Sequence, residues 1–474
     1  MDAAVIKPAG AVSTSSSTTT TTTSRRWVLA TSLCSLACLF LLSAGLLVLL
    51  AVGSRPPPLQ APPWGRFSRV VAHKAAPASA APLVSVPAPA AVDPDWDQQQ
   101  PEQQQEEEGA APPAPAPEPA GEGEEDEEEC DMFEGTWVRG GGDGDDDERY
   151  PLYEAAECPF LSDQVACRRN GRPDSGYERW RWRPRGCAAR TRVGGAEALE
   201  ACRDRRVVMV GDSLNRNMWE SLACILYTAV PDRSRARIIN DAGVEIFRAM
   251  DYNCSVEFFW SPFLVKLETK ADRTRALKLD QLPTMLQRAL GADVIVFNTG
   301  HWWTHTGKLR AWDHLERDGK MVEMAGEEAF NRALRTWARW VDHNIDPSRT
   351  RVFFRSVSPE HKSVNWCYNQ TTPITNGTVD PWFPKSLVSI VERTIRSMRA
   401  PVTYLNITHL SELRIDAHPS VYTITREGKP LSTEQRQQPI TYADCSHWCL
   451  PGLPDTWNVL LLASLMRPQS NVNF

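Results

Sequence analysis

The sequence predicts an α/β fold in which helices cover both faces of a mainly parallel β-sheet, and its second half carries the evidence. Apolar stretches of strand length alternate there with longer segments whose apolar residues recur at helical spacing. This alternation is typical of parallel strands joined by crossover helices. The expected strands are 207–210, 293–298, 351–356 and 402–406, and the expected helices are 214–227, 326–344, 384–399 and 455–466.

The first expected strand ends in a turn that could present a nucleophile. Residues 207–210 are followed by Gly211, Asp212 and Ser213, and a helical pattern begins at Leu214. A strand–turn–helix of this kind places Ser213 at the carboxyl edge of the sheet, beside a helix amino terminus that stabilises developing negative charge. Either Asp212 or Ser213 could instead simply cap the helix. The tripeptide by itself does not decide between these interpretations.

Asp444 and His447, near the carboxyl terminus, could supply the base that such a serine needs. Their spacing lets both side chains face one site when the segment turns, so that Asp444 fixes the imidazole tautomer while the other ring nitrogen faces Ser213. A surface Asp/His pair is the alternative. Joint occurrence with the Gly-Asp-Ser turn, in a chain of alternating strands and helices, favours catalysis.

Further residues could complete such a site. Asn298 ends an expected strand and could donate its side-chain amide to an oxyanion, or cap a loop. Arg216 could bind a substrate anion or support the loop, and the sequence does not separate these roles. Four tryptophans could offer flat apolar faces for stacking on sugar rings: Trp180, Trp182, Trp302 and Trp303. Packing in the core is the alternative for each of them.

The amino-terminal part has a different composition. Residues 1–26 are rich in Ser and Thr and are expected to form a disordered cytosolic tail. Residues 27–53 carry no charge and are long enough for a transmembrane signal anchor, with a buried globular helix as the alternative. Arg25 and Arg26 favour a cytosolic amino terminus, although basic residues also follow the segment.

A stem and a catalytic domain are expected after the anchor. Residues 54–129 are rich in Pro, Ala, Gln and Glu and predict an extended lumenal stem; a partner-binding acidic tail is the alternative. The catalytic domain would span 130–474, with a Cys-rich lobe at 130–202 and the α/β core at 203–474. The first 129 residues contain 7 basic and 16 acidic residues, which leaves 45 and 43 of the 52 and 59 for the domain. A near-neutral to mildly basic domain suits a weakly anionic polymer, and no nucleic-acid partner is expected.

Cysteines and glycosylation signals favour a lumenal domain. Ten of the twelve cysteines lie at or beyond residue 130, an even number that fits a disulfide framework in an oxidising compartment. The spacings lack the tight CxxC pairs of structural zinc sites, so no metal is expected, although Cys445 and Cys449 flank His447 and keep zinc open locally. Asn253 falls in an expected strand, where a glycan is accepted less easily. Four N-glycosylation sequons begin at Asn253, Asn369, Asn376 and Asn406. Together with the cysteines they predict a type II membrane protein.

Several motifs together resemble those of plant trichome birefringence-like polysaccharide O-acetyltransferases, which have a PC-esterase domain. They follow one another in the family order, and the resemblance runs from Cys130 to about Met466. The motifs are Cys130–Val138, Tyr150–Tyr153, Cys167–Asp174, Trp180–Trp182, Gly211–Asn217 and Asp444–Gly452.

The resemblance implies an SGNH/GDSL-like fold, residence in the Golgi membrane and O-acetylation of a cell-wall polysaccharide, with xylan as the best-known acceptor. It implies that Ser213 is the acetyl-accepting nucleophile, His447 the general base and Asp444 its orienting acid. Cys202 and Cys254 are additional to the family pattern and could pair or stay free. The disulfides that the resemblance implies are Cys130–Cys187, Cys158–Cys224, Cys167–Cys449 and Cys367–Cys445.

Several questions of function stay open at this point. Pectin is the second acceptor, and an acetylesterase would use the same three residues with water as acceptor. A glycan-binding membrane protein with a degenerate site is the non-enzymatic alternative. No bound cofactor is expected; no coenzyme A motif is visible, so the acetyl donor is acetyl-CoA or another acetyl carrier.

Overall fold

The computed structural model describes residues 130–140, 150–186, 193–362, 366–375 and 383–466. The chain divides into two units, Met1–Phe67 and Ser68–Phe474, and every described residue belongs to the second. The expected tail, membrane anchor and stem lie outside the described residues. Within the ranges above, each helix falls short of the length or the apolar character that spanning a bilayer requires.

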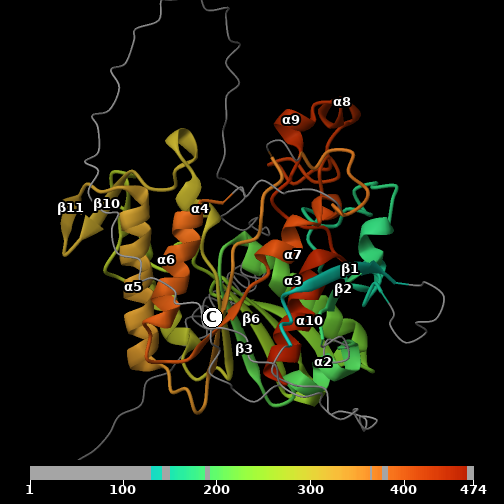
Figure 1. Ribbon diagram of the computed structural model, residues 1–474, viewed down its shortest axis with the longest axis horizontal. Coiled ribbons are helices and arrows are strands. Elements are labelled where there is room, and N and C mark those ends of the chain that lie inside the picture. Colours follow the sequence, from blue (N-terminus) through green and yellow to red (C-terminus); the bar gives the residue numbers. More distant parts are fainter. Residues whose placement is uncertain (1–129, 141–149, 187–192, 363–365, 376–382, 467–474) are drawn as a thin grey trace, which may run out of the picture. The chain divides into compact units, whose positions relative to one another are not determined.

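A seven-stranded sheet forms the centre of the described part, with the strand order β13-β12-β9-β3-β6-β5-β4 (Figure 1). The pairs from β13 to β6 are all parallel, whereas β5 pairs antiparallel with both β6 and β4. The sheet is therefore mainly parallel, as predicted. Its strands are β3 Arg206–Gly211, β4 Ala236–Asp241, β5 Val244–Ala249, β6 Cys254–Trp260, β9 Val294–Phe297, β12 Arg351–Arg355 and β13 Val402–Leu405.

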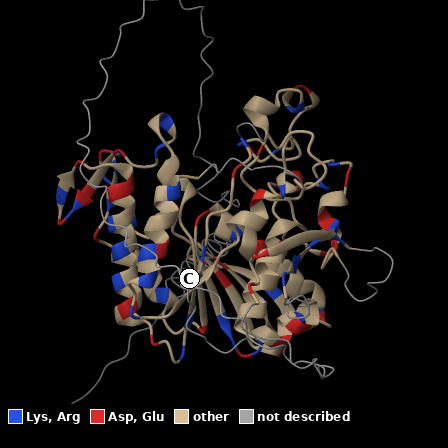
Figure 2. Cartoon of the chain, in the orientation of Figure 1, with Lys and Arg blue, Asp and Glu red and all other residues tan. Residues whose placement is uncertain are grey.

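Helices cover both faces of this sheet because successive residues of each central strand point to opposite sides. In β3, Val207 and Met209 join one buried apolar cluster, which includes residues of α2 (Gly195–Cys202), α3 (Ser213–Ala229) and α10 (Leu453–Leu465). Val208 and Val210 join the other cluster, with α5 (Gly326–Asn344) and α6 (Lys385–Arg396). Figure 1 shows these two helix layers on either side of the strands. Figure 2 shows basic residues along α5, and Arg335 and Arg339 of this helix are exposed.

All four expected strands and all four long helices are present, with ends shifted by at most a few residues. The four strands named from the sequence leave out β4, β5 and β6 of this sheet. In β6, Glu257 interrupts the apolar pattern. The carboxylate of Glu257 is buried in the sheet and pairs with Arg206 at 2.7 Å. The placement of Asn253 in a strand is wrong: Asn253 adopts a left-handed turn (φ 49°) directly before β6, and its side chain is exposed.

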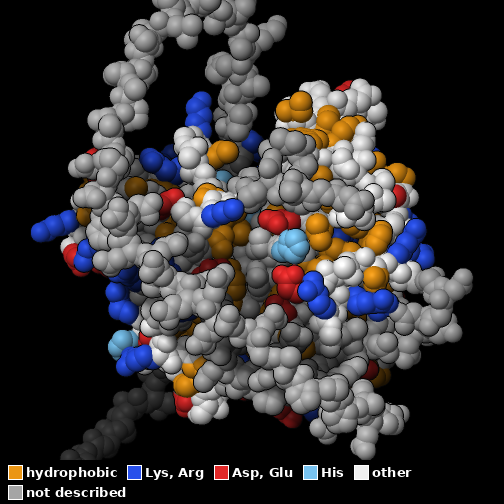
Figure 3. Space-filling view, in the orientation of Figure 1, with side chains coloured by type: hydrophobic (Ala, Val, Ile, Leu, Met, Phe, Trp, Pro, Cys, Tyr) orange, Lys and Arg blue, Asp and Glu red, His pale blue; other side chains and the backbone are white. Residues whose placement is uncertain are grey.

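Smaller elements surround the central sheet. A second sheet has the order β11-β10-β8-β7, and β1 and β2 form an antiparallel pair. These strands are β1 Gly135–Arg139, β2 Trp180–Pro184, β7 Lys266–Thr269, β8 Arg275–Lys278, β10 His314–Arg317 and β11 Lys320–Val322. The short α-helices are α4 His301–Thr304, α7 Thr408–Glu412, α8 Thr433–Arg436 and α9 Pro439–Tyr442. Short 3-10 helices lie at Ala155–Glu157, Gly176–Arg179, Arg233–Arg235, Met250–Tyr252, Thr284–Ala289, Gly307–Leu309 and Ile415–Ala417. Hydrophobic side chains reach the surface near α8 and α9 (Figure 3), where Ile440 is 86% exposed.

Disulfides tie the amino-terminal lobe to the α/β core. Three of the bonds are pairs that the family resemblance implied, and the fourth settles the state of the two additional cysteines. The expected bond between Cys130 and Cys187 involves a residue outside the described part of the chain, as does the sequon at Asn376. The disulfides found are Cys158–Cys224, Cys167–Cys449, Cys202–Cys254 and Cys367–Cys445.

Candidate active site

Ser213 is the first residue of α3 and follows Gly211, the carboxyl end of β3, by two positions. Asp212 caps the helix, since its Oδ1 accepts the Leu214 N–H at 3.0 Å. The preceding Gly211 is dictated by space, because a Cβ there would lie 1.8 Å from Oδ1 of Asn298. The sequence thus forms a tight turn that presents the serine hydroxyl at the edge of the sheet.

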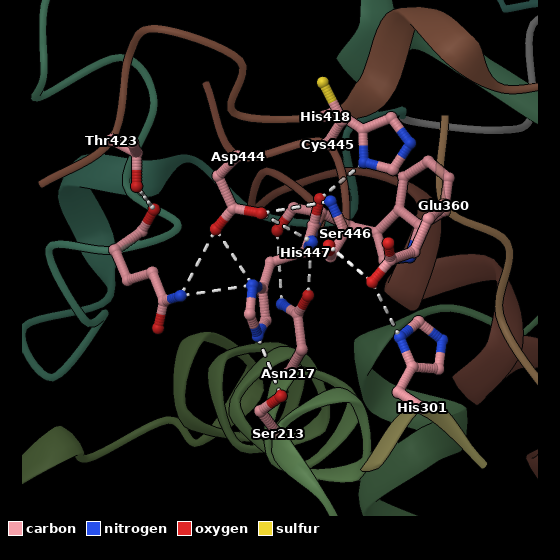
Figure 4. A network of polar contacts seen from close by, with 12 residues as sticks. Ser213, Asn217, His301, Glu360, His418, Thr423, Asp444, Cys445, Ser446 and His447 are labelled. Carbon is pink, nitrogen blue, oxygen red and sulfur yellow. Dashed lines mark hydrogen bonds and ion pairs between the residues drawn. The ribbon is translucent and has the colours of Figure 1, made fainter. Parts of the chain in front are cut away.

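At this turn Ser213 meets two residues that lie far from it in the sequence, Asp444 and His447 (Figure 4). Nε2 of His447 lies 2.8 Å from Oγ of Ser213, and Nδ1 of the same ring lies 2.8 Å from Oδ2 of Asp444. The side chains of His447 and Asp444 are 18% and 15% exposed, so solvent still reaches the site. The three side chains form one hydrogen-bond chain in the order Ser–His–Asp, which can move a proton from the hydroxyl to the ring.

The electrostatics of the pair favour a charged imidazole next to a carboxylate. Burial alone would raise the pKa of Asp444, but the His447 charge and its hydrogen bonds outweigh burial and hold this pKa well below its usual range. Burial would lower the pKa of His447, yet the Asp444 charge and hydrogen bond raise it above its ordinary value. Asp444 therefore makes His447 a stronger base.

The segment that carries His447 is held by its backbone. Oδ1 of Asp444 accepts the N–H groups of Ser446 and His447, both at 3.0 Å. Nδ1 of His418 lies 2.7 Å from the His447 carbonyl oxygen and donates to it, and the His418 ring stacks on Trp448 at 3.8 Å. These contacts fix the direction of the imidazole.

The two cysteines that flank His447 serve this segment as anchors. Cys445 is bonded to Cys367 and Cys449 to Cys167, so neither sulfur is free as a thiolate ligand for zinc. Across the described ranges, no group of three or more His, Cys, Asp or Glu side chains is arranged to hold a metal ion.

Asn298 lies beside the serine turn, and both ends of its carboxamide contact Asp212. Its Nδ2 donates to Oδ1 of Asp212 at 2.8 Å, and its Oδ1 accepts the Asp212 N–H at 3.2 Å. The side chain is 3% exposed. Asn298 thus connects the end of β9 to the turn after β3 and fixes the position of that turn.

The expectation that Trp303 offers a face to a sugar is wrong. Trp303 is only 7% exposed and packs edge-on against Phe263 and Phe330 in the core. Trp182 is likewise buried, where it meets Trp137. Trp180 and Trp302 are half-buried, and Trp302 packs edge-on against Trp260 at the carboxyl end of β6.

Arg216 supports the fold through acidic neighbours. Its Nε donates to Glu245 at 3.2 Å, and a guanidinium nitrogen lies 3.8 Å from Glu220. Glu220 in turn accepts hydrogen bonds from the backbone and hydroxyl of Ser162 in the amino-terminal lobe. Of the two roles left open by the sequence, this environment favours support over the binding of a substrate anion, because two carboxylates already neutralise the guanidinium.

Several residues around the three-residue chain were not predicted from the sequence. Oε1 of Glu360 accepts the Ser446 hydroxyl at 2.9 Å and lies 3.2 Å from Nδ1 of His301 (Figure 4), while its Oε2 pairs with Lys362 at 2.9 Å. Burial would raise the pKa of Glu360, but His301 and Lys362 outweigh burial and lower it, so the carboxylate stays charged. His301 lies just beyond the expected strand 293–298, a position that could have identified it.

Gln164 and His418 were also missed. Nε2 of Gln164 lies 3.2 Å from Oδ2 of Asp444. No local sequence pattern identifies either residue, because more than two dozen residues separate each of them in sequence from the residue that it contacts.

The chain matches two family models that together cover most of the described residues. Residues 191–464 match the GDSL/SGNH-like acyl-esterase family found in Pmr5 and Cas1p, called PC-esterase, and residues 128–188 match the PMR5 N-terminal domain. The mainly parallel α/β fold is consistent with the SGNH-like assignment.

Curated relatives agree with this assignment. Protein trichome birefringence-like 1 of Arabidopsis thaliana is 44% identical over 358 residues, which cover 71% of this chain and 61% of that protein. Xylan O-acetyltransferase 6 of Oryza sativa subsp. japonica is 40% identical, with coverage of 71% and 62%. The chain thus spans about six-tenths of the length of these two relatives. It covers 78% of probable xylan O-acetyltransferase 10 from the same rice, at 39% identity over 362 residues. The chain belongs to the PC-esterase family and, within it, to the trichome birefringence-like proteins.

Proposed function

We propose that this protein is a polysaccharide O-acetyltransferase that transfers acetyl groups to hydroxyls of a plant cell-wall glycan, with xylan as the leading acceptor. The hydrogen-bond chain from Ser213 through His447 to Asp444 is the observation that carries this proposal. The rice relatives are named as xylan O-acetyltransferases, which supports acetyl as the transferred group and xylan as the acceptor.

In the proposed first step, Nε2 of His447 accepts the proton of the Ser213 hydroxyl while Oγ attacks the carbonyl carbon of the acetyl donor. The tetrahedral oxyanion would be stabilised by the Ser213 N–H at the start of α3, with Asn298 as a second donor through the amide hydrogen that does not face Asp212. When the intermediate collapses, the donor's leaving group takes the proton from His447, and acetyl-serine is formed.

In the second step, His447 accepts the proton of a sugar hydroxyl whose oxygen attacks the acetyl-serine carbonyl. Collapse of this intermediate breaks the bond to Oγ, and Ser213 regains its proton from the imidazole. The sugar must outcompete water, so an aromatic contact for the ring is expected close to the serine. Half-buried Trp302, after the end of β9, is the tryptophan we propose for this contact.

We further propose a type II protein of the Golgi membrane with a lumenal catalytic domain. The uncharged segment 27–53 and the sequons support this, as do the disulfides, which persist in oxidising compartments. Asn253, Asn369 and Asn406 are exposed and could accept glycans. The acetyl donor is acetyl-CoA or another acetyl carrier.

Ser213→Ala tests the proposal. Purified protein is incubated with xylo-oligosaccharides and an acetyl donor, acetylation is mapped by NMR, and the acetyl-serine is sought by mass spectrometry. Ser348→Ala, on an exposed loop, is the matched control. We expect the control to transfer acetyl groups normally and Ser213→Ala to lose both transfer and the acetyl-serine. Normal transfer by Ser213→Ala would overturn the assignment.

An acetylesterase is the second function that the same side chains support, and the family description names acyl-esterases. The two activities differ only in whether a sugar or water attacks the acetyl-serine. Incubation with acetylated and unacetylated xylan and pectin oligosaccharides separates them and ranks pectin against xylan. Failure of a serine-directed covalent probe to label Ser213 would instead favour a glycan-binding protein.

A further inference from the structure

The amino-terminal lobe sends one side chain into the candidate active site. Gln164 lies between Cys158 and Cys167, and both of these cysteines are bonded to the α/β core, at Cys224 and Cys449. Its Nε2 lies 3.2 Å from Oδ2 of Asp444 and 3.1 Å from Nδ1 of His447. A half-buried glutamine from the lobe that matches the PMR5 N-terminal domain thus faces the Asp–His pair of the other matched domain.

Donor and acceptor roles at this contact follow from the neighbours. Nε2 of His447 must accept from Ser213, so Nδ1 carries the ring proton and donates it to Asp444. Nδ1 and the Gln164 amide are then both donors, and both point at the same carboxylate oxygen. Oδ1 of Asp444 already accepts two backbone N–H groups. All the acceptor capacity of the carboxylate is therefore used, and its orientation is fixed.

The loop that carries Gln164 is fixed against the same region. The Gln164 carbonyl accepts the Thr423 hydroxyl at 3.1 Å, and the Val165 carbonyl accepts the Leu450 N–H at 3.0 Å. Together with the bond between Cys167 and Cys449, these contacts attach the lobe to residues that precede and follow His447 in the sequence. Gln164 therefore reaches Asp444 from an anchored backbone.

We propose that Gln164 is a positioning residue for the Ser213–His447–Asp444 chain: its amide holds the Asp444 carboxylate in place and weakens the carboxylate's pull on the His447 proton. The amino-terminal lobe is then part of the active site. This inference rests on the proposed function, in which His447 acts as the base.

Removing the amide donor has a defined electrostatic consequence. An Asp444 carboxylate that no longer accepts a hydrogen bond from Gln164 holds the imidazolium more strongly, which raises the pKa of His447. The other groups that influence this ring are Asp444, Asp212 and Lys362, with the Glu360 carboxylate on the far side of Ser446. None of them changes in a Gln164 variant.

The test compares Gln164→Leu and Gln164→Glu with wild type and with Asp163→Asn, whose exposed carboxylate pairs with the Arg169 side chain. For the full-length protein, kcat/KM for acetylation of xylo-oligosaccharides is measured against pH. In Gln164→Leu we expect the acidic limb to move to higher pH, with about a tenfold loss at a pH on that limb. Gln164→Glu adds a negative charge and should move it further, while Asp163→Asn should match wild type. A uniform loss at all pH values, or no change, would overturn the proposal.

A second measurement separates this inference from the proposed function. The imidazole nitrogens of His447 are titrated by NMR in full-length Ser213→Ala protein labelled with [15N]histidine, with and without Gln164→Leu. No turnover is needed. A higher titration pH in the double variant supports the role of Gln164, and an unchanged one refutes it. Acetyl transfer by Ser213→Ala itself would refute the proposed function only.

Discussion

Replacing Asp444 by asparagine tests the proposed role of the carboxylate most directly, because the structure dictates how the new side chain must sit. The Asp444 oxygen that accepts the backbone N–H groups of Ser446 and His447, at 3.0 Å each, has to remain an oxygen. The asparagine amide nitrogen then replaces Oδ2, which lies 2.8 Å from Nδ1 of His447, and donates to that nitrogen. The imidazole is left with its proton on Nε2, which faces Ser213 and can no longer accept a proton.

The expected loss is large, because the fold stays intact while the tautomer is wrong. A base locked in the wrong tautomer reduces kcat by roughly 10³ to 10⁴, which corresponds to about 4 to 5.5 kcal/mol of activation free energy. Initial rates of acetyl transfer to xylo-oligosaccharides measure it, with Ser213→Ala as the floor. Asp251→Asn, which removes an exposed carboxylate paired with Arg235, is the control and should keep full activity. An Asp444→Asn variant with more than about a tenth of the wild-type kcat would refute this account of the site.

Three further predictions concern pH and stability. Asp444 raises the pKa of His447 above the ordinary 6.5, and His447 must be neutral to act as a base. The value of kcat/KM should therefore fall as pH drops through a value above 6.5, and an acidic limb of the pH profile below 6.5 would contradict this prediction. Burial raises the pKa of Asp455 from 3.8 to about 7, so the free energy of unfolding of the wild type should fall by roughly 4 kcal/mol as pH rises between these two values. Urea unfolding of Asp455→Asn should show no such fall, and parallel pH profiles of the two proteins would refute this prediction. Replacing both Cys367 and Cys445 by serine removes a disulfide that spans 78 residues and should lower the free energy of unfolding by about 2 to 5 kcal/mol. It should also reduce kcat, since Cys445 anchors the segment that carries His447; unchanged urea midpoints would argue against this prediction.

The local sequence pattern was sufficient to predict a strand or helix where burial is uniform along it. Residues 207–210 are apolar on both sides because the sheet is covered on both faces, so the strand was predictable. The strand Cys254–Trp260 was not, because Glu257 becomes acceptable in a buried strand only once Arg206 lies on the neighbouring strand. The adjacent Trp302 and Trp303 show the same limit: only the packing of Phe263 and its neighbours decides which ring is buried.

The sequence by itself determined the strand–turn–helix around Ser213, the chemical types of the catalytic candidates and the family, because turn chemistry, apolar periodicity and motifs are written locally. Only the tertiary structure decided that Ser213 and His447, 234 positions apart, lie within hydrogen-bond distance. It also decided that Asn298 and Arg216 contact carboxylates and that Gln164 reaches Asp444. Distances between remote side chains depend on how helices and disulfides pack the lobe and the core together, and no local pattern encodes that packing.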